Sequence, residues 1–196
     1  MTRYADFHQR SITDRDGFWA EQARLIDWQQ PFDKVCDYSN PPFAGWFVGG
    51  KTNLCHNAVD RHLKDRADQN ALIFVSTETE QEQVYSFREL HAEVQRMAAV
   101  LQSLGVKQGD RVLVYMPMIP EAAFAMLACA RIGAVHSVVF GGFASVSLAS
   151  RIDDASPTVI VSADAGMRSG KVVSYKPLLD EAIRLANDTE FGLAAS

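Results

Sequence analysis

The stretch from Arg111 to Phe143, RVLVYMPMIPEAAFAMLACARIGAVHSVVFGGF, limits the possible folds of this chain more than any other. RVLVY is a short β-branched run after Gly109-Asp110, which predicts a buried strand, and Pro117 and Pro120 end it. EAAFAMLACARI has the length and composition of a helix, and Gly133 stands where a C-cap glycine belongs. AVHSVVF predicts a second strand. Strand, helix and strand in this order predict a βαβ unit with two parallel strands and a right-handed crossover.

The residues that follow repeat this alternation. SVSLASRIDDA predicts a second crossover helix that Pro157 ends, and TVIVSA predicts a third parallel strand. The fold class predicted is α/β: a doubly wound, mostly parallel sheet with helices on both faces. Ligands of such sheets bind at the carboxyl ends of the strands, which here points to Met116–Met118 and Gly141–Ala144. A loop, ADAGMRSGK, then leads to a short strand and a last helix.

The residues before Arg111 predict less regular structure. Asp14 is placed to cap an aromatic-rich helix that runs to about Leu25, and residues 31–52 predict irregular chain with one or two short strands. Asn53 is a candidate N-cap for one helix, LCHNAVDRHLKDRA. ALIFVST predicts a strand that pairs with Val84-Tyr85 as a hairpin.

A strong helix signal follows this hairpin. Ser86 and Glu89 fit a capping box, which predicts a helix that runs to Gly105. Its apolar side chains recur at helical spacing, so this helix is expected to be amphipathic.

Composition excludes several classes of function. The 196 residues are 47% hydrophobic and carry a formal net charge of −5, which argues against a nucleic-acid partner. No apolar run approaches the ~18 residues of a membrane span. Cys36, Cys55 and Cys129 show no CxxC spacing, and their odd number favours reduced thiols in a cytoplasmic protein.

Residues Gly45–Thr52, GWFVGGKT, fit the P-loop pattern GxxxxGK[ST]. A P-loop needs a strand before its first glycine and small residues whose N–H groups converge on phosphate. Here SNPPFA precedes Gly45, and Trp46, Phe47 and Val48 resemble a strand. The pattern therefore favours a surface strand followed by a helix start, with a P-loop nucleotidase as a minor alternative.

Two further segments are candidate anion sites. Gly141-Gly142-Phe143 lies between a predicted strand and a helix, where glycine serves either a ligand or a tight turn. Arg168, Ser169, Gly170 and Lys171 place two cations on a loop, a pattern that grips phosphate but that solvated surface loops also show.

The histidines suggest no metal or catalytic site. Cys55-His56 with His62 lacks a standard zinc spacing, and His136 interrupts a predicted buried strand, which favours a hydrogen-bonded core residue. No catalytic triad or paired-carboxylate site is evident.

The chain resembles the amino-terminal part of the short-chain acyl-CoA synthetases, AMP-forming enzymes of the adenylate-forming superfamily. The segments that carry this resemblance cover most of the chain to about Ile183: DYSNPPFAGWFVGGKTNLCHNAVDRHL, LGVKQGDRVLVYMPMIPEA, ACARIGAVHSVVFGGFA, RIDDASPTVIVSADAG and RSGK. NPPFAGWFVGG and TNLCHNAVDRHL favour the propionate-activating branch, the propionyl-CoA synthetases (propionate–CoA ligases).

The resemblance implies a reaction and a set of ligands. Such enzymes use MgATP to convert a short carboxylate, here propionate, to an acyl-adenylate, and CoA then displaces AMP. The family's basic loop matches Arg168, Ser169, Gly170 and Lys171, which implies contacts with the CoA phosphates. Lys171 stands where acetyl-CoA synthetases often carry Arg, so bidentate binding there is expected to be weaker.

The sequence also lacks much of the family's machinery. It contains no TSGTTGxPKG-type ATP loop, no later adenine, ribose or magnesium motifs, and no carboxyl-terminal domain. The resemblance therefore implies a ligase fragment with no catalytic or metal residues of its own, inactive alone. A stand-alone CoA- or nucleotide-binding or regulatory module is the alternative.

The expected organisation has three parts: an amino-terminal arm at 1–60, a partial AMP-binding large domain at 61–186, and an atypical tail at 187–196. The tail, NDTEFGLAAS, resembles a segment of aldehyde dehydrogenases, but ten residues carry no dehydrogenase function. Chance similarity, a gene fusion and a faulty gene model would each explain it.

Overall fold

The computed structural model describes the backbone of residues 3–193, and the chain divides into two compact units, Met1–Asn57 and Ala58–Ser196. The first unit contains two helices, α1 (Tyr4–Thr13) and α2 (Arg15–Gln22), and a 3₁₀ turn, η1 (Ala23–Leu25). An antiparallel hairpin follows, made of β1 (Lys34–Asn40) and β2 (Phe43–Val48). This unit is the irregular α/β arm that the sequence predicts.

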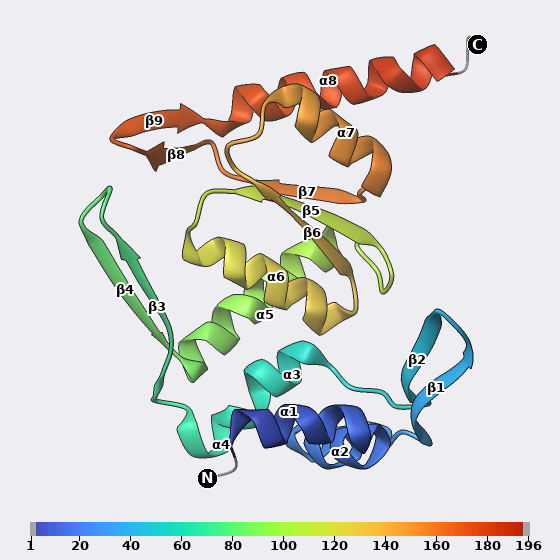
Figure 1. Cartoon of the computed structure of the whole chain (residues 1–196). Coiled ribbons are helices and arrows are strands. Elements are labelled where there is room, and N and C mark those ends of the chain that lie inside the picture. Colours follow the sequence, from blue (N-terminus) through green and yellow to red (C-terminus); the bar gives the residue numbers. More distant parts are fainter. Residues whose placement is uncertain (1–2, 194–196) are drawn as a thin grey trace. The chain divides into compact units, whose positions relative to one another are not determined.

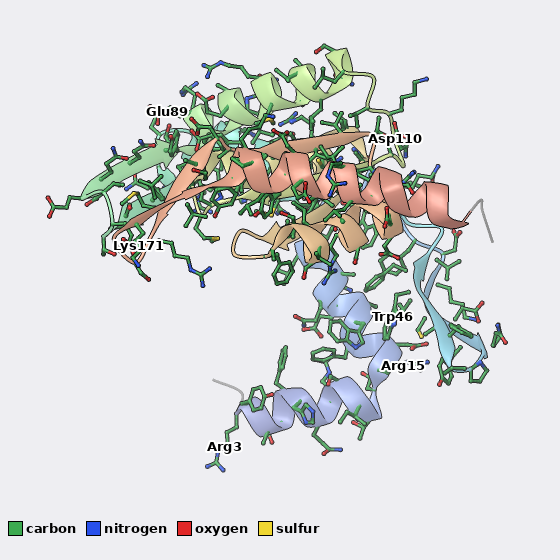
Figure 2. All side chains as sticks on the ribbon, turned by 90° about the horizontal axis from the view of Figure 1, so that it is seen from above. Arg3, Arg15, Trp46, Glu89, Asp110 and Lys171 are labelled. Carbon is green, nitrogen blue, oxygen red and sulfur yellow. The ribbon has the colours of Figure 1, made fainter. Side chains whose placement is uncertain are left out.

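Aromatic side chains hold the arm together. Phe18 is buried and meets the rings of Phe7 and Trp19 edge-on, at 4.7 and 5.2 Å between centroids. The ring of Trp19 in turn lies edge-on to that of Trp46 on β2, with 5.9 Å between centroids. Figure 2 labels Trp46. Asp14 occupies the N-cap position of α2 as predicted, but its side chain makes no capping hydrogen bond there.

The prediction of a single helix after Asn53 is wrong. The chain forms three short pieces instead: α3 (Leu54–Ala58), η2 (Asp60–His62) and α4 (Leu63–Arg66). Asn53 does cap α3, since its Oδ1 accepts the N–H of His56 at 3.0 Å. Val59 leaves helical geometry at φ −128°, and Asp60 beyond it accepts a hydrogen bond from Arg131 and lies 3.4 Å from His91 Nε2. These tertiary partners outweigh helix propensity.

The next elements agree with the sequence. β3 (Asn70–Ser76) and β4 (Gln81–Ser86) form an antiparallel hairpin, and α5 (Phe87–Ser103) follows at once. Ser86 and Glu89 make the full capping box. The predicted stripe is buried at Leu90, Val94, Ala98 and Leu101.

The predicted βαβ unit is confirmed. β5 (Arg111–Met116), α6 (Pro120–Ile132) and β6 (Val135–Phe140) follow in order, and the two strands pair in parallel. Gly133 ends α6 with φ 75°, a conformation that suits glycine. α7 (Ser145–Ala155) and β7 (Val159–Ser162) complete a parallel sheet of order β6-β5-β7.

Helices cover both faces of this sheet, as predicted (Figure 1). α5 and α6 lie on one face, and α7 lies with α8 (Tyr175–Leu193) on the other. Side chains alternate along β5, so Leu113 and Tyr115 face the α7–α8 side while Val112 and Val114 face α6. The predicted atypical tail, 187–196, lies partly outside the described residues, and its backbone continues α8 as far as Leu193.

β6 forms one edge of the parallel sheet, and this corrects the expectation for His136. The prediction of a buried strand places His136 in the core, but the side chain is exposed. Val135 and Val138 on the same strand are also more than half exposed. A run of apolar residues predicts burial, but only the sheet order shows that this strand lacks a described neighbour on one side.

The three cysteines are free thiols and all are buried. Burial raises the pKa of the Cys129 thiol to about 11, because the thiolate is poorly solvated there. We expect the folded chain to resist iodoacetamide at pH 8, since the reactive species is the thiolate. Intact-mass spectrometry with and without denaturant checks this; alkylation of Cys129 in the folded chain at the rate of an exposed thiol would contradict it.

Within the described residues, no helix has both the length and the apolar character needed to cross a bilayer.

Candidate functional site

The basic segment Arg168–Lys171 is a hairpin turn rather than the loop that the sequence predicts. β8 (Ala165–Arg168) and β9 (Lys171–Ser174) pair in antiparallel register, with Arg168 opposite Lys171. The two residues between them, Ser169 and Gly170, have φ 51° and 71°. Positive φ at both central residues is typical of a type I′ turn, which suits Gly170 and strains Ser169. Figure 2 shows Lys171 at the tip of this hairpin.

A carboxylate occupies the two central backbone amides of this turn. Glu78 Oε1 accepts the Ser169 N–H at 2.8 Å, and Glu78 Oε2 accepts the Gly170 N–H at 2.7 Å. Consecutive N–H groups in a turn form a concave anion site of this kind. Glu78 belongs to the tip of the β3–β4 hairpin, more than 90 residues earlier, and Figure 1 shows the two hairpins on the same side of the second unit.

The two cations of the turn, Arg168 and Lys171, are exposed to solvent. All four residues of the segment are exposed. Burial raises the pKa of the Tyr175 hydroxyl, and the positive charge of Arg168 partly offsets this rise. An exposed guanidinium and an exposed ammonium are chemically suited to bind phosphate oxygens, while the two backbone donors beside them are bound to Glu78.

Gly141, directly after β6, lies against a buried aromatic ring. A Cβ at Gly141 would lie 2.2 Å from the Tyr175 hydroxyl oxygen and 2.8 Å from its ring. Tyr175 is buried, so its ring fills the space where a larger residue at 141 would project. Tyr115 in β5 donates a hydrogen bond to the Phe143 carbonyl at 3.2 Å and fixes the same turn. This geometry favours the tight-turn interpretation of Gly141-Gly142-Phe143.

The P-loop interpretation of Gly45–Thr52 does not fit the geometry. Gly45, Trp46, Phe47 and Val48 lie in β2, and the Lys51 backbone pairs with Gln30 in a β-bridge. The Thr52 hydroxyl donates to the Asp27 carbonyl at 2.7 Å. The residues that would surround phosphate therefore make strand and loop contacts, as the surface-strand interpretation predicts.

No histidine joins a metal site. Among the residues whose side chains the structure describes (3–186, apart from Phe140), no three His, Cys, Asp or Glu side chains come together in a way that could hold a metal ion. His56 lies 3.4 Å from Asp27, and the His62 ring packs on Phe87.

Comparison with known families decides what kind of chain this is. The family profile described as "AMP-binding enzyme" matches residues 59–191, more than half of the chain. The chain belongs to the AMP-binding enzyme family. A second profile, "Acetyl-coenzyme A synthetase N-terminus", matches residues 4–58 and covers the arm. The resemblance to the short-chain acyl-CoA synthetases is thus confirmed.

Individual relatives refine this assignment. The chain is 63% identical over 183 residues to the propionate–CoA ligase of Escherichia coli, covering 93% of this chain and 29% of the relative. It is 50% identical over 185 residues to the acetyl-coenzyme A synthetase of Methylobacterium radiotolerans, covering 93% and 28%. The chain therefore spans less than a third of the length of these curated relatives.

A solved structure supports the fold. The acetoacetyl-CoA synthetase of Streptomyces lividans matches with a TM-score of 0.86 and 31% identity, over 94% of this chain and 28% of that one. The described fold is thus part of the large domain of an adenylate-forming enzyme, preceded by its arm.

Glu78 is the residue of this site that sequence reasoning misses. It lies in the polar run TETEQEQ, where an acid in a turn carries no signal beyond solvent exposure. Only the meeting of two hairpins far apart in the sequence reveals its bond to Ser169 and Gly170.

Proposed function

We propose that the chain forms the amino-terminal part of a propionate–CoA ligase, which converts propionate, ATP and CoA to propionyl-CoA, AMP and pyrophosphate. The observation that carries this proposal is the higher identity to a propionate–CoA ligase, 63%, than to an acetyl-coenzyme A synthetase, 50%, with 93% of the chain covered in both comparisons. The arm boundary at residue 60 and the large domain at 61–186 belong to the same proposal.

In this proposal the segment Arg168–Lys171 binds the nucleotide phosphates of CoA. Arg168 offers a planar fork with several donors, while Lys171 offers a compact charge. Both side chains leave the same two-residue turn, so a phosphate at its tip meets two cations at once. Charge-assisted hydrogen bonds of this kind are about twice as strong as neutral ones.

The chemical steps are assigned to parts of the family's sequence that this chain lacks. The family's ATP loop, with its lysine, has no counterpart among these 196 residues, and Mg²⁺ finds no ligand cluster among the described ones. Phosphate chemistry needs preorganised donors and metal to stabilise the developing charge. We therefore propose that the chain alone makes no propionate-dependent AMP.

An activity assay tests both halves of this proposal. The chain alone is compared with a chimera in which it replaces the matched portion of the E. coli propionate–CoA ligase, and AMP release is measured with propionate and with acetate. We expect AMP from the chimera, a preference for propionate, and none from the chain alone. AMP release by the chain alone would contradict the fragment interpretation.

Replacing Arg168 tests the CoA site in the same chimera. We expect Arg168→Ala to raise the KM for CoA about tenfold or more and to leave that for ATP nearly unchanged, since a charge-assisted bond contributes ~1.5–3 kcal/mol. The control is Arg151→Ala, which removes an equal charge from an exposed position on α7. A CoA dependence unaltered by Arg168→Ala would reject the site.

A further inference from the structure

The bond between Glu78 and the Ser169–Gly170 amides is the least expected contact near the basic turn. The bond is bidentate: each carboxylate oxygen accepts one backbone N–H, at 2.8 and 2.7 Å. A phosphate group likewise presents two oxygens to a pair of donors, so the same amides suit either anion. We call the Ser169 and Gly170 N–H groups the phosphate seat of the turn. This seat is already occupied by an anion from the same chain, the Glu78 carboxylate.

We propose that Glu78 is an internal competitor for the phosphate seat of the Arg168–Lys171 turn and so determines how tightly that turn binds phosphate-bearing ligands. This inference rests on the proposed function for its ligand, CoA. Two negative groups cannot share one pair of N–H donors, and like charges at contact distance repel. A phosphate that enters the seat must therefore displace the carboxylate.

The construction of both hairpins allows this exchange. Glu78 lies between β3 and β4, beyond the last ladder pair, Ser76 with Gln81. Rotation of its exposed side chain releases the amides without breaking any hydrogen bond of the ladder. The amides themselves stay in place, because the Arg168 and Lys171 pairing holds the turn with Ser169 and Gly170 at positive φ.

Loss of Glu78 then has a predictable sign. With the carboxylate gone, the turn keeps its two cations and gains two unoccupied donors, so phosphate binding becomes tighter. A residue that only braces the turn would give the opposite result, because its removal would loosen the donors. The direction of the change therefore separates competition from bracing.

The test uses the whole chain and inorganic phosphate as the probe. Amide chemical shifts of Ser169 and Gly170 are followed by NMR as phosphate is added at fixed ionic strength. The series is wild type, Glu78→Gln, which keeps a neutral acceptor, and Glu78→Ala, which removes the acceptor. Glu82→Gln is the control, since it removes an equal charge from an exposed position on β4 of the same hairpin.

We expect the apparent affinity of these two amides for phosphate to rise at least about fivefold in Glu78→Ala, with Glu78→Gln between it and wild type. Glu82→Gln should behave as wild type, because salt screens more distant exposed charges. Equal phosphate affinity in Glu78→Ala and Glu82→Gln would overturn the inference. Weaker binding in Glu78→Ala would also overturn it, in favour of bracing.

A second titration with CoA separates this inference from the proposed function. If the turn is the CoA site, CoA shifts the same amides, Glu78→Ala tightens its binding, and Arg168→Ala weakens it. A phosphate response without any CoA response in all variants would support the competitor and reject the CoA assignment. A CoA response that ignores Glu78→Ala would keep the CoA site and reject the competitor.

Discussion

Replacing Tyr115 with Ala is expected to lower the free energy of unfolding of the second unit by about 3–5 kcal/mol, the cost of removing a large aromatic side chain from a core. Among the described residues, Tyr115 is the largest fully buried side chain, with no measurable exposure. It stands on the central strand β5 and packs against Tyr175 of α8, with 5.0 Å between ring centroids. Its ring therefore connects the sheet directly to a covering helix.

The matched variant Tyr115→Phe isolates the hydroxyl. It removes only the hydrogen bond to the Phe143 carbonyl, which has a length of 3.2 Å, so we expect a loss of about 0.5–1.5 kcal/mol. Urea unfolding followed by far-UV circular dichroism measures both variants. If Tyr115→Ala were to cost no more than Tyr115→Phe, the ring would not be a core element and the described packing of α8 would be wrong.

The sequence predicts the part of this fold in which local signals and tertiary packing agree. Gly133 ends α6 because only a residue without Cβ adopts its left-handed conformation easily, and that requirement is visible in the sequence. In the capping box of α5, the Ser86 side chain accepts the backbone N–H of Glu89 and the Glu89 side chain accepts that of Ser86, so this feature also needs no distant partner. Features of this kind depend on a few neighbouring residues, so a short stretch of sequence is enough to recognise them.

Predictions fail where a distant partner decides the outcome. The helix expected after Asn53 breaks at Val59, beside an aspartate that binds Arg131 and lies near His91, both far along the chain. His136 belongs to an apolar run, yet the order of strands places it at an edge. Hydrophobic periodicity shows which side chains of a segment are suited to burial, but the elements that pack against the segment in the folded chain determine which of them are buried.

In the candidate site, too, some features follow from neighbouring residues and others from distant partners. Two cations separated by Ser-Gly are visible in the sequence, and so is their match to the family's basic loop. The left-handed turn that aligns the Ser169 and Gly170 amides, and the Glu78 carboxylate on them, arise from pairing β8 with β9 and from the approach of another hairpin. Backbone donors have no sequence signature of their own, since every residue except proline carries one.

Gly141→Ala is expected to lower the free energy of unfolding by about 1–3 kcal/mol, the cost of overpacking a well-filled core. The added Cβ would lie 2.2 Å from the Tyr175 hydroxyl oxygen, and at the opposite edge of the ring even a Cβ built on Gly166 would come within 3.1 Å, so the ring has little room to move away. The backbone of Gly141 is outside the left-handed region, so the penalty comes from the contact and not from φ. Gly45→Ala is the control, because a Cβ there has no neighbour closer than 3.4 Å.

A double-mutant cycle with Tyr175→Phe identifies the contact. Removing the hydroxyl relieves the shortest of the clashes but leaves the ring carbon at 2.8 Å, so Phe at 175 should recover part of the loss and give a coupling of about 0.5 kcal/mol or more. Additive effects would mean that Tyr175 does not fill the space beside Gly141. The tight-turn interpretation would be wrong if Gly141→Ala left the stability of the chain unchanged but weakened the binding of ATP or propionate by the chimera. Gly141 would then be needed for the approach of a substrate and not for the packing of α8.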